Sequence, residues 1–217
     1  MKYVLTEDSI VKWGITLFRI KALMSFGDVE EGELGGYLER EANLSQEGKS
    51  WVFDNASVFD NARVSGDAGI FDNARVSGDA GIFGNARIFS DASVSGDARI
   101  FGNARIFGNA RIFSDARIFG NASVSGDARI FGNAIIFSDA HWLYVGPIGS
   151  RDSFTTFFRN RDNQIYVVCG CFSGTLDEFE RAVTKTHAGT KHEVSYKLAI
   201  ELSKAQLDLS EECECGE

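Results

Sequence analysis

The chain has 217 residues, 44% of them hydrophobic, and a formal net charge of −9. Acidic residues are spread along the whole chain, so a general electrostatic attraction to nucleic acid is not expected. No apolar run reaches the roughly 18 residues that a transmembrane helix needs, and residues 1–8 lack the apolar core of a signal peptide. We therefore expect a cytoplasmic protein without a membrane partner.

The first part of the chain has the features of a cap. Short apolar runs at residues 3–5 and 16–20 predict the two strands of a β-hairpin. Leu44 then follows the pattern of the repeat described next, but eight residues rather than six separate it from Val52. We assign residues 1–51 to an N-terminal β-hairpin and an irregular first coil, because a stack of repeats needs a cap at its end.

A period of six residues governs the next part of the chain. Fifteen alanines run from Ala56 to Ala140, each six residues after the previous one and four residues after an aliphatic side chain. Hexapeptide repeats are typical of a parallel β-helix. This pattern resembles left-handed β-helices, in which three hexapeptides form one triangular coil. We predict a mainly β protein in which residues 52–140 form a left-handed parallel β-helix of about five regular coils.

Each position of the repeat has an expected role. The aliphatic residue and the Ala point inward, and the Asn or Asp before each Ala is expected to turn the corner with a positive φ. The residue after the aliphatic one points outward, and eleven of these residues are Phe. A monomer seldom exposes so much apolar surface, so we predict a homo-oligomer, a trimer or a dimer. The column expected at its interface is Phe83, Phe101, Phe119 and Phe137.

After the repeat, residues 141–210 have the pattern of an α+β domain, and an acidic tail follows at 211–217. Strands are predicted over residues 142–145, 154–159 and 164–172. Thr175 followed by Glu178 is a capping-box pattern, which predicts a helix that ends at about His187. A second helix is predicted to carry its apolar residues on one face. These residues are Val194, Leu198, Leu202, Ala205 and Leu209.

Several segments resemble hexapeptide-repeat proteins of bacteriophages and prophages, which are often labelled transferase-like or polymer-forming. The segments are residues 34–39, 43–48 and 51–52 near the start, and 148–151 and 169–175 near the end. The resemblance implies a β-helix with an α+β tail. It also suggests a non-catalytic protein that binds a host protein in the host cytoplasm, as a host-interaction or counter-defence factor. The alternatives are an oligomeric sponge for a small nucleotide signal, an acyltransferase, and a structural spacer or virion component.

Acyl transfer is the enzymatic alternative, because many left-handed β-helices transfer acyl groups. Enzymes of that kind resemble one another in a catalytic His on or near a loop, with CoA between adjacent prisms of a trimer. His141 stands where the repeat ends and is the candidate for this role. The regular repeat itself contains no His. We therefore expect His141 to cap the helix, and we expect neither a catalytic residue nor a cofactor.

A basic and aromatic cluster follows the repeat. Arg151, Arg159 and Arg161 lie near Phe157 in the sequence, and side chains of these two types can together hold a nucleotide or a phosphate. The alternative is an ordinary hairpin with outward Arg and inward Phe, which nearby aspartates favour by diluting the charge. These four residues are the expected recognition surface outside the repeat.

The four cysteines form two Cys-x-Cys pairs, Cys169/Cys171 and Cys213/Cys215. Two such pairs can make a four-thiolate zinc site. The first pair lies on a predicted strand, however, and the second lies in the acidic tail. We therefore expect no metal site.

Overall fold

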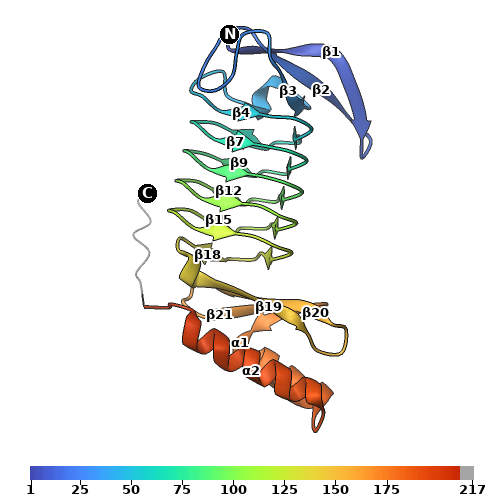
Figure 1. Cartoon of the computed structure of the whole chain (residues 1–217), viewed down its shortest axis with the longest axis vertical. Helices are drawn as coiled ribbons and strands as arrows, with labels where there is room; N and C mark the ends of the chain where they lie inside the picture. The colour runs from blue at the N-terminus through green and yellow to red at the C-terminus, as the bar shows by residue number, and fades with distance from the viewer. Residues whose placement is uncertain (211–217) are drawn as a thin grey trace.

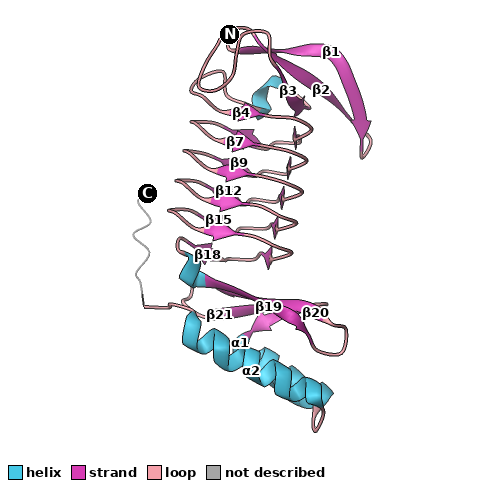
Figure 2. Ribbon diagram, viewed as in Figure 1, coloured by secondary structure: helices cyan, strands magenta, loops and turns pink. Residues whose placement is uncertain are grey.

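The computed structural model describes residues 1–210. The molecule is a tall column, with the N-terminal strands at one end, a stack of coils in the middle, and a small sheet with helices at the other end (Figure 1). Strands and turns make up nearly all of the chain before the C-terminal helices (Figure 2). The predicted fold class is confirmed: a mainly β protein with a parallel β-solenoid and a C-terminal α+β unit.

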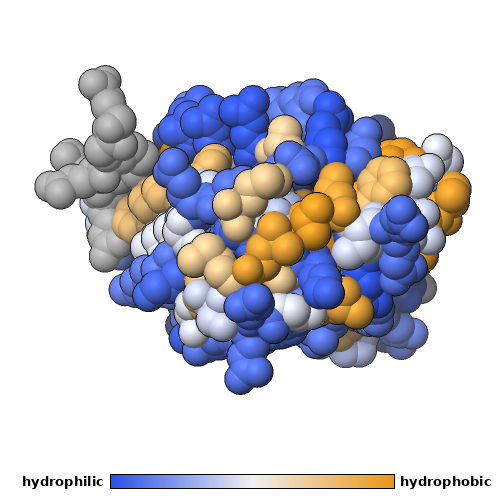
Figure 3. Space-filling view, turned by 90° about the horizontal axis from the view of Figure 1, so that it is seen from above, coloured by the Kyte–Doolittle hydropathy of each residue, from blue (hydrophilic) through white to orange (hydrophobic). Residues whose placement is uncertain are grey.

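The N-terminal strands extend one face of the solenoid. Strands β1 (Tyr3–Lys12) and β2 (Ile15–Ala22) form an antiparallel hairpin, and β2 pairs with β3 (Leu34–Leu38). Strand β3 then pairs in parallel with β5, the first solenoid strand on that face. A 3-10 helix, η1 (Glu41–Asn43), follows β3. The hairpin is therefore continuous with a solenoid sheet rather than a separate domain. Seen from above, this end of the molecule shows a band of hydrophobic side chains between hydrophilic ones (Figure 3).

Between residues 51 and 136, fifteen two-residue strands stack into three parallel columns of five strands each. One column consists of β4 (Trp51–Val52), β7 (Gly69–Ile70), β10 (Arg87–Ile88), β13 (Arg105–Ile106) and β16 (Ser123–Val124). The second consists of β5 (Ser57–Val58), β8 (Arg75–Val76), β11 (Ser93–Val94), β14 (Arg111–Ile112) and β17 (Arg129–Ile130). The third consists of β6 (Arg63–Val64), β9 (Gly81–Ile82), β12 (Arg99–Ile100), β15 (Arg117–Ile118) and β18 (Ile135–Ile136).

The core of the solenoid repeats as strictly as the sequence. The inward aliphatic residues and the alanines from Ala56 to Ala134 are at most 1% exposed. A bridge between Leu44 and Val64 places the irregular first coil on top of the five regular ones. At the other end, Ala140 is exposed in a second 3-10 helix, η2 (Asp139–His141). The sequence pattern therefore runs slightly past the last solenoid strand.

The corner residues differ from the expectation by one position. Positive φ, between 52° and 71°, falls on the third residue of each hexapeptide from Asp54 to Gly132, which is the residue before the Asn or Asp. The Asn and Asp side chains instead bridge successive coils. Asn85 donates from Nδ2 to Oδ1 of Asn103 (3.1 Å), and Asn103 donates in the same way to Asn121 (3.1 Å). These residues therefore bond one coil to the next, and their neighbours make the turn.

The C-terminal unit is an antiparallel sheet in the order β19-β20-β21-β22, followed by two helices. The strands are β19 (Trp142–Ile148), β20 (Ser153–Arg159), β21 (Ile165–Cys169) and β22 (Phe172–Thr175). The predicted capping box opens α1 (Leu176–His187): the Glu178 N–H donates to Thr175 Oγ1 (3.4 Å), and the Thr175 N–H donates to the Glu178 carboxylate (2.9 Å). Neither helix among residues 1–210 has the length and apolar character of a membrane span.

Helix α2 (Lys191–Gln206) buries a different face from the apolar one read from the sequence. Of the residues predicted to share a face, Val194, Leu198 and Leu202 are 59%, 66% and 44% exposed. The helix packs instead through Tyr196, Ala199, Ile200 and Ser203. This buried face mixes Tyr196 and Ile200 with the small residues Ala199 and Ser203, so the spacing of the most hydrophobic residues alone gave the wrong side.

Candidate binding face

A column of phenylalanine rings follows one face of the solenoid. We call the face formed by β6, β9, β12, β15 and β18 the Phe101 face. The rings of Phe101 and Phe119 stack with centroids 4.8 Å apart, and those of Phe119 and Phe137 with centroids 5.3 Å apart. Stacking leaves these three rings half-buried, and Phe83, whose ring lies over Gly81, is half-buried as well. The exposed apolar area is therefore smaller than the sequence suggested.

Arginines stand beside this ring column. Arg99 and Arg117 are in-register neighbours on adjacent strands, and Gly81 separates Arg63 from Arg99. None of these three arginines forms an ion pair with another residue of the described chain. Because like charges side by side repel one another, the column favours an anionic group supplied from outside.

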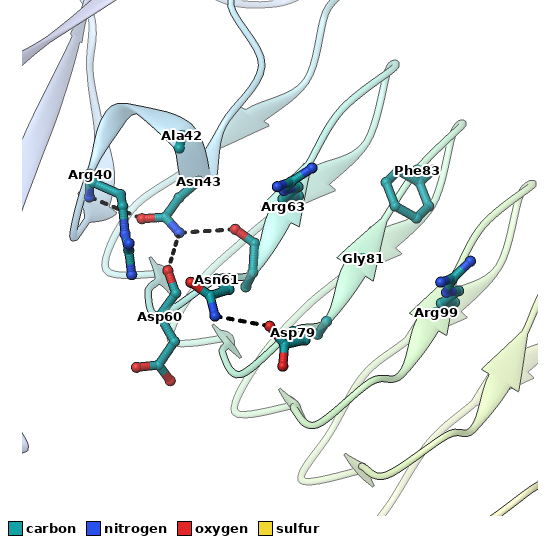
Figure 4. Close-up of a pocket in the computed structure, with 12 residues that line it drawn as sticks. Arg40, Ala42, Asn43, Asp60, Asn61, Arg63, Asp79, Gly81, Phe83 and Arg99 are labelled. Atoms are coloured by element: carbon teal, nitrogen blue, oxygen red, sulfur yellow. Dashed lines mark hydrogen bonds between the residues drawn. The ribbon is translucent and has the colours of Figure 1, made fainter.

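A hollow of 520 Å³ lies at the N-terminal end of the Phe101 face (Figure 4). Arg63 and Arg99 stand on either side of Gly81 and Phe83 in this view. A side chain at residue 81 would collide with the Phe83 ring, so the glycine provides the place that the ring occupies. The missing side chain thus puts an aromatic surface between two cations.

The rim of the hollow is held by a buried amide. Asn43, 1% exposed, donates from Nδ2 to the carbonyl oxygens of Asp60 (3.0 Å) and Ala62 (2.9 Å). Its Oδ1 accepts from the Arg40 N–H (3.0 Å). On the next coil, Asn61 donates from Nδ2 to Oδ1 of Asp79 (3.0 Å). The irregular first coil is therefore bonded rigidly to the regular ones beside the hollow.

The chain's own terminal units cover the face formed by β5, β8, β11, β14 and β17 at both ends. Trp13 of the N-terminal hairpin stacks on Phe59, with ring centroids 5.2 Å apart, and Arg75 lies over the Trp13 ring. At the other end, Phe131 contacts Phe158 and Tyr166 of the C-terminal sheet. These contacts show that stacked rings and arginines on this solenoid accept an aromatic partner.

The structure gives His141 a structural environment. The residue is fully buried, and its Nδ1 accepts from the Phe137 N–H (3.2 Å). Its Nε2 lies 3.2 Å from Nη1 of Arg159, and its ring contacts the Phe137 ring. Both ring nitrogens thus face other groups of the protein, at the end of the solenoid.

The four residues of the expected recognition surface do not come together. Arg159 is 1% exposed, donates from Nε and Nη2 to Oδ1 of Asn163, and lies over the Phe137 ring. Phe157 is fully buried in the core of the C-terminal unit. Arg151 and Arg161 remain exposed, on different loops. The hairpin surface predicted from sequence is therefore not formed, because its central residues are used for packing.

Two features of the site were not identified from the sequence. They are the arginines of the Phe101 face and the buried Asn43. Arg99 and Arg117 are 18 residues apart, which is one coil of three hexapeptides, so the sequence already indicated that they lie side by side.

Of the cysteines, Cys169 is half-buried and Cys171 exposed, and the second pair lies outside the described residues. Residues 1–210 contain no cluster of metal-ligating side chains.

Known proteins share the repeat. A model of the YdcK β-solenoid repeat family matches residues 92–112. The chain carries a hexapeptide-repeat β-solenoid. It is also 39% identical over 62 residues to a protein of Escherichia coli (strain K12) named "Uncharacterized acetyltransferase YdcK". That match covers 28% of this chain and 19% of the E. coli protein, so the likeness concerns a short stretch of both.

Proposed function

We propose that the protein is a rigid, non-catalytic binding protein that recognises another protein through the Phe101 face. The observation that carries this proposal is the pairing of unpartnered Arg99 and Arg117 with the stacked Phe101 and Phe119 rings on a flat sheet. Backbone hydrogen bonds between coils fix the spacing of these groups, so little entropy is lost when a partner binds. Rigid surfaces of this kind suit recognition better than turnover.

The chemistry of the face defines its partner. Arginines bind carboxylates bidentately, and aromatic rings contact apolar side chains. The partner expected is a protein surface with carboxylates beside apolar groups. That this partner is a host protein, and that binding it counters a defence system, follows only from the resemblance of residues 34–39 and 169–175 to phage repeat proteins.

Acyl transfer is the second candidate, because the similar E. coli protein is named an acetyltransferase. Three observations support binding instead. The match covers 19% of that protein. The strands between residues 51 and 136 follow one another with short turns throughout. His141, the candidate catalytic residue only under this alternative, is buried, and its ring nitrogens face the Phe137 N–H and Arg159.

Site-specific photo-cross-linking tests the proposal in cells that naturally express the protein. A photoreactive phenylalanine analogue replaces Phe101, and in a control it replaces Ser95 on the neighbouring face. We expect a discrete cross-linked partner from residue 101 and none from residue 95. Charge reversal by R99E/R117E is expected to remove the cross-link, whereas R87E/R105E, an in-register pair on the face formed by β4, β7, β10, β13 and β16, is expected to leave it unchanged.

Three outcomes would contradict the proposal. Equal cross-linking from both positions would mean that the Phe101 face has no special role. A cross-link that survives R99E/R117E would remove the arginines from recognition. A cross-link between two copies of this chain would identify a homo-oligomer interface in place of a different partner protein.

A further inference from the structure

The C-terminal unit contains a pocket that the binding face does not use. A cavity of 280 Å³ lies between the β21–β22 hairpin, the loop before β20, and the two helices. Its walls are largely apolar and include Phe172, Phe179, Ala182 and Val183. This volume is at the lower limit of the range, roughly 300–1,000 Å³, of pockets that bind small molecules. The cavity is too small for a nucleotide or CoA.

Two polar side chains of the inner wall, Cys169 and Tyr196, connect to a third, Thr155, which is fully buried behind the wall. The Thr155 hydroxyl donates to Sγ of Cys169 (3.2 Å), and Sγ lies 3.6 Å from the hydroxyl of Tyr196. Tyr196 is 8% exposed, and burial raises the pKa of its hydroxyl above the usual value. Gly149 packs against this hydroxyl so closely that no side chain fits there. The inner wall therefore offers neutral hydrogen-bonding groups in a fixed position.

A cation stands at the mouth of the pocket. Arg151 is exposed and reaches Gly170, where its Nη1 lies 3.8 Å from the position that a Cβ would take. Its charge is close enough to oppose the rise in the Tyr196 pKa. Within residues 1–210, Arg151 forms neither an ion pair nor a hydrogen bond. His187 also lines the pocket.

We propose that this pocket binds a small carboxylate with an apolar body, such as a medium-chain fatty acid. The apolar body packs against Phe179 and Val183, and the carboxylate pairs with Arg151 at the mouth. An apolar cavity with a few convergent polar groups is the usual form of a small-molecule site. The exposed arginine selects an anionic headgroup, and its planar donors fit a carboxylate. This proposal is independent of the Phe101 face.

Alkylation of Cys169 reports whether the pocket is occupied, because the thiol lies in its wall. N-ethylmaleimide is added to the full-length C171S protein, and the reaction is followed by mass spectrometry on the peptide that carries Cys169. We expect octanoate to slow this alkylation at least fivefold, and octan-1-ol to require roughly tenfold higher concentration for the same protection, as expected for one lost charged hydrogen bond.

Two variants with the same change in charge test the headgroup. R151Q is expected to lower octanoate protection to the level of octan-1-ol, whereas R181Q, an exposed position on α1 outside the pocket, is expected to leave it unchanged. A182F fills the cavity and is expected to remove protection by both compounds. If A182F does not fold, as judged by circular dichroism, the comparison of R151Q with R181Q still decides.

The proposal is overturned in either of two ways. If octanoate at millimolar concentration left the alkylation rate of Cys169 unchanged, no small apolar carboxylate of this kind would bind in the pocket. Alternatively, octanoate and octan-1-ol protect equally, or R151Q and R181Q behave alike, which would show that Arg151 does not select a carboxylate.

Discussion

The solenoid and the C-terminal unit differ in how they provide hydrogen-bond partners for buried backbone groups. In the regular coils, most backbone N–H groups donate to a carbonyl oxygen of the next coil, as Arg87 does to Ala104, and the repeating inward positions hold only aliphatic residues and Ala. In the C-terminal unit, the structure buries polar side chains. They include His141, Thr155, Thr156, Arg159, Asn160 and Ser203. In the C-terminal unit, individual polar side chains supply the hydrogen-bond partners that the next coil supplies in the repeat.

The buried polar groups gather where the repeat stops. The last coil has no further coil to bond to, so the C-terminal unit supplies the partners. The Arg129 N–H donates to Oγ1 of Thr156 (3.1 Å), and the Asn133 carbonyl accepts from the Arg161 N–H (2.9 Å). Repeat stacks need such caps because the terminal coil exposes polar backbone. The buried polar side chains of this protein are thus concentrated at the two ends of the stack.

The largest expected loss of stability comes from truncating a buried isoleucine in the core of either region. Ile106 and Ile200 are both at most 1% exposed but belong to different hydrophobic clusters. Truncation of either to Ala is expected to cost about 2–5 kcal/mol in the free energy of unfolding. Hydrogen exchange should show I106A losing protection across several coils, because each coil bonds to its neighbours, whereas I200A loses protection in α1 and α2 alone.

The exchange pattern can contradict this division. If I200A lowers protection throughout the solenoid as much as in the helices, then the two clusters unfold as one unit. The two regions would then differ in composition but would not differ in how they unfold.

The same division explains how much could be predicted from the sequence. The solenoid was predicted correctly because the positions of Ala104 and Ile100 recur in every coil, so one local rule applies throughout. The helix α1 was predicted from a single capping box. The turn was misplaced by one residue because Asn and Asp both tolerate positive φ and form side-chain ladders, and composition does not distinguish these roles.

The site was predicted less well for a physical reason. Arg159 and Phe157 looked like an exposed hairpin, but the last coil needs a cover, and these side chains provide it. Leu198 looked like a core residue because it is apolar and correctly spaced. Which face of α2 packs depends on the sheet beneath it, and sequence spacing carries no information about that surface.

A pair of glycine variants tests the strictness of the repeat. Gly102 and Gly132 both have positive φ, 69° and 65°, but a Cβ at Gly102 would lie 2.9 Å from the Gly120 nitrogen, whereas a Cβ at Gly132 meets nothing within 4 Å. Substitution by Ala is expected to cost about 1 kcal/mol at Gly132 and about 2–3 kcal/mol at Gly102. Urea unfolding measures both, and equal losses would mean that the coils shift freely apart.

The N-terminal end should make the free energy of unfolding depend on pH through Lys2. Burial lowers the pKa of Lys2 to about 8, although its Nζ donates to the Ser50 carbonyl oxygen (2.9 Å). Between pH 8 and 10 the folded protein releases this proton while the unfolded chain keeps it, so the free energy of unfolding rises with pH. We expect a gain of roughly 1–2 kcal/mol between pH 7.5 and 9.5.

Two variants identify the source of this gain. K2M is expected to show no rise over the same interval, since it has no proton to release, whereas K21M, an exposed position on β2, keeps the rise. Denaturant unfolding at the two pH values gives the comparison. A rise of equal size in K2M would assign the effect to another group.

The smallest expected effect concerns the exposed side of α2. Leu198 is 66% exposed, so its truncation to Ala removes little buried surface, and Ala is a slightly better helix former than Leu. The free energy of unfolding of L198A should stay within about 0.5 kcal/mol of the parent, against a loss several times larger for I200A two residues away. Thermal and urea unfolding of the isolated protein measure both. A large loss in L198A would mean that this face is buried in solution, and because nothing in residues 1–210 covers Leu198, the cover would have to come from another molecule.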